Sequence, residues 1–70
     1  MRQEELQKLT EQISRDYFHR PFLHMVKINH RMRTTGGRYH LDDHHIEINA
    51  HFLEAKNQKY LVGIIKHELC

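Results

Sequence analysis

The chain contains a single proline, Pro21, and the hydrophobic pattern has a different period on its two sides. Before it, apolar side chains recur every three or four residues, at Leu6, Leu9, Ile13 and Tyr17. This spacing predicts an amphipathic helix of about four turns. Proline lacks an amide hydrogen and disfavours helical geometry in the preceding residue, so the helix should end by Arg20. The rest of the chain needs structure of another kind.

After the proline, the pattern becomes extended. Side chains alternate between two faces from Phe22 to Asn29, which predicts a strand. The Gly36–Gly37 pair tolerates positive φ and marks a turn or bulge, and the Asp42–Asp43 pair suits a second turn. Further alternating pairs are Tyr39 with Leu41 and Ile46 with Ile48. Three short strands with turns between them predict a small sheet with one buried face.

Two further helical segments follow the strands. Asn49 can cap a short helix over Ala50–Ala55, which would carry Phe52 and Leu53 inward. A last helix begins near Gln58, and its expected buried residues are Leu61, Val62, Ile64, Ile65 and Leu69. The expected fold class is therefore α+β, with an N-terminal helix, a three-stranded sheet, a short helix and a C-terminal helix in one domain spanning 1–70.

Length and cysteine content limit the class of protein. Seventy residues make one domain at most, and folding buries only about 60% of the unfolded surface at this size. One cysteine, Cys70, cannot form an intramolecular disulfide, which favours a reduced, cytoplasmic protein. No apolar segment follows Met1, and no uncharged stretch is long enough to span a membrane. The net charge of +2 is too small to indicate a nucleic-acid partner by itself.

The last helix carries the most specific functional signal. His67 and Glu68 lie within an apolar segment, where a charged pair is costly without a partner. Residues 67–70 match the first four positions of the zinc-hydrolase motif HExxH, whose histidines lie one helical turn apart and whose glutamate is the general base. Nothing in the sequence terminates this helix. We therefore expect the chain to be the front part of a longer protein.

Four segments, taken in order, add to this signal: they are Arg20–Phe22, Asn29–Tyr39, Ile46–Asn49 and Gly63–Cys70. Together they closely resemble the bacterial SprT-like protein family. The resemblance implies a zincin-like domain with His67 as the first zinc ligand and Glu68 as the catalytic acid/base. It places the second motif histidine, the third ligand and a cysteine-rich zinc ribbon beyond Cys70. The complete protein would hold one Zn²⁺ at the HExxH site, and this chain alone should bind none tightly and be inactive.

The resemblance also implies partners. The first is the C-terminal part of the same protein, which would complete the domain. Related eukaryotic domains resemble DNA-dependent metalloproteases that act on proteins crosslinked to DNA, so DNA or a protein is the expected substrate of the full-length protein. No membrane partner is expected.

Two other functions are compatible with the sequence. Arg31, Arg33 and Arg38 surround the glycine pair and would form a basic hairpin, so the chain can instead be a small module that binds nucleic-acid phosphates with salt-sensitive affinity. A solvated hairpin is favoured, because no aromatic residues interleave to stack on bases. The chain can also be a folding unit without activity, whose apolar last helix seeks a partner.

The remaining candidate ligands are expected to be structural. His40, His44 and His45 lie near a turn and can bind metal incidentally, but their spacing matches no defined site, so surface positions are predicted. His24 shares a strand face with apolar residues and is predicted to be a hydrogen-bonded core or edge residue. Cys70 would give only a loose metal site and is expected to be a small apolar residue of the intact helix, exposed in this chain.

Overall fold

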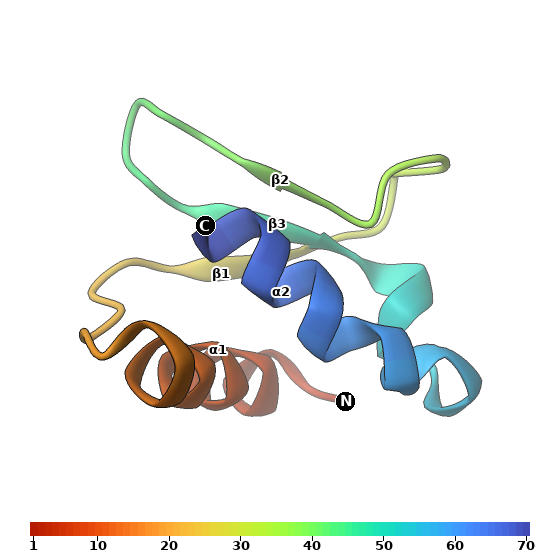
Figure 1. Cartoon of the computed structure of the whole chain (residues 1–70). Coiled ribbons are helices and arrows are strands. Elements are labelled where there is room, and N and C mark those ends of the chain that lie inside the picture. The colour runs from red at the N-terminus through yellow and green to blue at the C-terminus, as the bar shows by residue number, and fades with distance from the viewer.

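A computed structural model describes all 70 residues and shows an α+β fold, which confirms the predicted class. Two α-helices cover one face of a three-stranded sheet (Figure 1). In chain order the elements are α1 (Gln3–Phe18), β1 (Val26–Asn29), β2 (Gly37–Tyr39), β3 (Ile46–Asn49), the 3₁₀ helices η1 (Ala50–Leu53) and η2 (Ala55–Tyr60), and α2 (Leu61–Leu69). No helix combines the length and apolar character that crossing a bilayer requires.

Helix α1 ends before the proline, as predicted. His19 adopts a left-handed conformation with φ 56° and closes the helix by donating its backbone N–H to the Arg15 carbonyl. The predicted apolar stripe is wrong at Tyr17, which is 58% exposed. Thr10 and Ser14 are buried in its place. Their hydroxyls donate to nearby carbonyl oxygens, so these polar side chains enter the core without losing hydrogen bonds.

Strand β1 is shorter than the predicted strand and begins only at Val26. Where the predicted strand would continue before Val26, the backbone is bonded by side chains of α1. Gln7 accepts from the Val26 N–H at 2.8 Å and donates to the His24 carbonyl at 2.9 Å. Gln3 also donates to the Val26 carbonyl. The neighbouring strand, β3, begins at Ile46, which is paired with Val26. Residues before Val26 therefore have no strand residue opposite them.

The strand order is β1-β3-β2, with β1 parallel and β2 antiparallel to β3 (Figure 1). The segment between β1 and β2 is therefore not a hairpin, and the predicted basic hairpin is wrong. The hairpin lies instead between β2 and β3. Neither Gly36 nor Gly37 has positive φ, and Gly37 belongs to β2, so conformational freedom in a turn does not explain the glycine pair.

The predicted short helix is the 3₁₀ helix η1. The Asn49 side chain accepts the His51 N–H at 3.0 Å, which is the expected cap. The same side chain donates to the Thr35 carbonyl at 2.9 Å and ties the segment before β2 to the end of β3. The predicted last helix is divided, because a 3₁₀ helix precedes α2. Val62, expected inside, is exposed.

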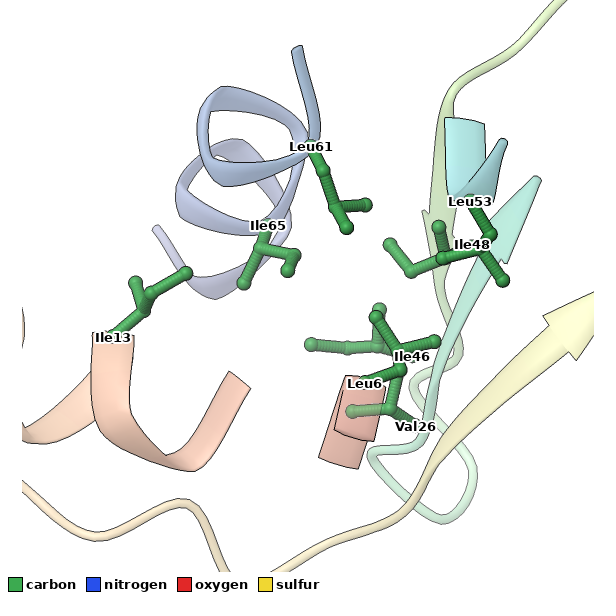
Figure 2. Packing of buried hydrophobic residues seen from close by; sticks show 8 residues of the cluster. All are labelled: Leu6, Ile13, Val26, Ile46, Ile48, Leu53, Leu61 and Ile65. Carbon is green, nitrogen blue, oxygen red and sulfur yellow. The ribbon is translucent and has the colours of Figure 1, made fainter. Parts of the chain in front are cut away.

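The core contains eight buried apolar residues between the helices and the sheet (Figure 2). They are Leu6, Ile13, Val26, Ile46, Ile48, Leu53, Leu61 and Ile65. Leu61 and Ile65 are the two buried residues of α2, and Ile64 and Leu69 are only half-buried. One side of α2 is thus fixed by the core, and the remainder is free to line a cleft.

Candidate metal centre

His67 and Glu68 lie in the last turn of α2. The core residues Leu61 and Ile65 anchor this helix against the sheet. His67 is exposed and Glu68 is half-buried. The imidazole is therefore accessible to a ligand, and the carboxylate lies beside it in a more sheltered position.

The glycine pair allows β2 to lie directly against this helix. A Cβ atom at Gly37 would be 3.0 Å from the Glu47 carbonyl oxygen and 3.3 Å from Cγ of Glu68. A Cβ atom at Gly36 would be 2.9 Å from Cδ1 of Ile64. Both distances to α2 are shorter than ordinary contacts between side chains. Close approach of helix and strand is therefore the reason for glycine at both positions, and it places the Glu68 side chain against β2.

Two cavities open on either side of this contact, and His67 and Glu68 line both. One has a volume of about 530 Å³ and is lined by Thr35, Gly36, Gly37, Phe52, Tyr60, Gly63, Ile64, His67 and Glu68. The other has a volume of about 480 Å³ and is lined by Arg20, Tyr39, Leu41, His67, Glu68, Leu69 and Cys70. The two side chains of the motif thus face a cleft whose opposite wall is β2 with its flanking residues.

Basic side chains near the end of α2 hold it in place, and the sequence pattern did not reveal this role. Arg20 donates from Nη2 to the Leu69 carbonyl at 3.3 Å, where a cation complements the negative end of the helix dipole. Lys66 places Nζ 3.4 Å from the ring centroid of Tyr17 in α1. These contacts orient the turn that carries His67.

The three predicted arginines do not line this cleft. Arg31, Arg33 and Arg38 are all exposed. Cys70 is a free, exposed thiol, as expected for this chain, and it lines the smaller of the two cavities.

The histidines outside α2 differ from their predicted positions. His24 is exposed and precedes β1, so it occupies neither the core nor a strand edge. His44 is exposed as predicted, but His40 and His45 are half-buried. The β2–β3 hairpin brings His40 and His45 together, which sequence spacing alone did not indicate.

Comparison with known proteins decides the family. The model of the SprT-like family matches residues 6–70. The chain belongs to the SprT-like family. Curated relatives of this SprT-like chain include Protein SprT-like of Bacillus cereus (strain G9842), which is 53% identical over 70 residues, and Protein SprT-like of Bacillus anthracis (strain CDC 684 / NRRL 3495), which is 51% identical.

These alignments cover all of the SprT-like chain but only 46% of each relative. The chain therefore spans about half the length of the curated relatives it matches. No solved structure matches it.

Proposed function

We propose that this SprT-like chain forms one wall of a zinc-dependent metallopeptidase site, with His67 as the first zinc ligand and Glu68 as the catalytic acid/base. The observation that carries the proposal is the shared position of these two side chains in a cleft between α2 and β2. An accessible imidazole beside a sheltered carboxylate is the pair that such a site requires. A segment equivalent to the second half of the curated relatives would supply the other ligands.

The residues present suit zinc but do not complete its donor set. Zinc hydrolase sites use three protein ligands and leave one position for water or substrate, and this cleft offers one imidazole from α2. When bound, zinc lowers the pKa of its water and polarises the substrate carbonyl. His67 would contribute one donor nitrogen. Glu68 would hold and transfer a proton at its carboxylate, and its Cγ atom lies close to Gly37 of β2.

The test uses the SprT-like polypeptide extended to the length of its relatives. Glu68→Gln should reduce peptide hydrolysis by about 10²-fold or more, because the amide cannot accept the proton, and it should leave bound zinc unchanged. His67→Ala should lose both zinc and hydrolysis. Zinc is measured by atomic absorption, and hydrolysis by release of fragments from an unfolded protein with and without DNA.

Matched controls come from outside the cleft. His30→Ala and Glu4→Gln change exposed residues of the same types that line neither cavity, so zinc content and hydrolysis should both be retained. Hydrolysis retained in Glu68→Gln would refute the role of Glu68. Zinc retained in His67→Ala would refute the role of His67.

The nucleic-acid alternative receives less support. The three arginines do not form a hairpin, because β3 lies between β1 and β2. Arg31 and Arg33 belong to the connection between β1 and β2, while Arg38 lies within β2. A cleft that contains both motif residues favours hydrolysis as the function.

A further inference from the structure

The β2–β3 hairpin places a group of polar side chains on the sheet face opposite the helices. The His40 N–H donates to the His45 carbonyl at 2.9 Å, so the two residues are cross-strand neighbours. Ile46 points into the core, so its neighbours on either side, His45 and Glu47, are directed to the outer face. This group therefore lies on the face of the sheet opposite α2, which carries His67.

Three side chains of this group can approach one metal ion. Their candidate ligand atoms, from His40, Asp42 and His45, all lie within 4.8 Å of one another. The two imidazole rings stack with centroids 4.1 Å apart and an interplanar angle of 9°. Two imidazoles and a carboxylate form a donor set that suits Zn²⁺ and similar divalent transition metals.

Each imidazole is also bonded to a carboxylate outside this set. Oε1 of Glu47 lies 2.8 Å from Nε2 of His40, and Asp43 bonds Nδ1 of His45. In the neutral imidazoles, these nitrogens carry the hydrogen, which leaves lone pairs on Nδ1 of His40 and Nε2 of His45. Carboxylates that bond the second nitrogen of metal-binding histidines fix the tautomer and increase ligand basicity.

We propose that His40, Asp42 and His45 form a second metal site on the outer face of the sheet, which takes a divalent transition metal such as Zn²⁺. Binding requires the stacked rings to rotate about their Cβ–Cγ bonds until both lone pairs point at one ion. The long side chain of Glu47 can follow the ring of His40, and Asp43 is held next to His45 by the backbone N–H of that residue. Water would complete the coordination.

The experiment is a titration of the 70-residue chain with Co²⁺ followed by visible absorption, and with Zn²⁺ followed by histidine ring signals in NMR spectra. One ion per chain should bind, and the ring nitrogens of His40 and His45 should shift. His45→Gln should weaken binding by more than tenfold. Glu47→Gln should weaken it by about 10-fold to 100-fold, because the neutral amide is a weaker acceptor for His40 and the carboxylate charge 3.7 Å from Nε2 of His45 is lost.

Asp42→Asn keeps the test independent of folding. Asp42 is exposed and makes no hydrogen bond in the structure, so the variant should retain the circular dichroism of the parent chain. Its affinity for the metal should nevertheless fall at least tenfold. His30→Gln and His67→Gln are the matched controls, and both should bind as tightly as the parent. Because His67 is the ligand of the proposed peptidase site, this control separates the two proposals.

Two outcomes would overturn the second site. The first is binding that His67→Gln removes and His45→Gln leaves unchanged. The second is that a folded chain shows no shift of the His40 and His45 rings at saturating Zn²⁺.

Discussion

At the scale of single residues, hydrogen bonds to histidine set the charge of the β2–β3 hairpin. Asp43 and Glu47 are both held below their ordinary pKa values, mainly by bonds from His45 and His40 respectively. The folded chain therefore binds fewer protons at these carboxylates than the unfolded chain in mildly acidic solution. Stability should rise with pH over that range.

The first prediction concerns acid unfolding. The contribution of Asp43 is present above its ordinary pKa of 3.8 and is lost as the pH falls toward about 2, where the folded group takes up its proton. Asp43→Asn should therefore flatten the dependence of the free energy of unfolding on pH between these values. Urea titrations at a series of pH values measure this slope.

Asp16→Asn is the control for that experiment, since Asp16 is exposed and makes no side-chain hydrogen bond. Its slope should match that of the parent chain. A steep slope that persists in Asp43→Asn would show that the bond to His45 does not control acid stability.

At the scale of elements, the contact of α2 with β2 depends on the absence of side chains. Gly37 faces the Glu47 carbonyl and Glu68, whereas Gly63 of α2 has open space around the position of a Cβ atom. Neither glycine has positive φ, so backbone strain does not distinguish them. The two positions make a matched pair for the same substitution.

Gly37→Ala should lower the free energy of unfolding by about 1–2 kcal/mol, because the added methyl group forces the strand or Glu68 to shift. Gly63→Ala should raise it by about 1 kcal/mol, because alanine is the better helix former and meets nothing. Urea unfolding of both variants provides the values. Equal effects of the two substitutions would contradict the close approach of α2 and β2.

At the scale of the whole molecule, eight buried apolar residues hold two helices and a sheet together. A core of this size in a chain of 70 residues rarely supplies more than about 3–5 kcal/mol of net stability. Ile65 of α2 is fully buried, and its side chain projects toward α1 and the sheet (Figure 2). Each such side chain therefore supplies a large share of the stability of the entire chain.

Ile65→Ala should cost about 2–5 kcal/mol, which is comparable with the net stability of the whole chain and should remove much of it. Val62→Ala changes an exposed residue of the same helix and should leave the fold intact. Circular dichroism during thermal unfolding distinguishes the two variants. If Ile65→Ala unfolds at the same temperature as the parent chain, most of the stability must come from contacts outside this core.

Local pattern alone determined several features of the protein. The period of apolar residues and Pro21 predicted the N-terminal helix and its end, and alternation predicted the three strands. The His67–Glu68 pair on an apolar helix indicated the candidate site. These features depend on neighbours within a few residues, which is why one sequence suffices to predict them.

Only the tertiary structure decided how these parts combine. The insertion of β3 between β1 and β2 turned an expected hairpin into a crossover, because strand order depends on pairing between distant segments. The glycine pair serves contact with α2 rather than a turn, and this role needs the position of another element. The group of His40, Asp42 and His45 exists for the same reason, since antiparallel pairing of β2 and β3 brings together side chains that spacing along the chain leaves apart.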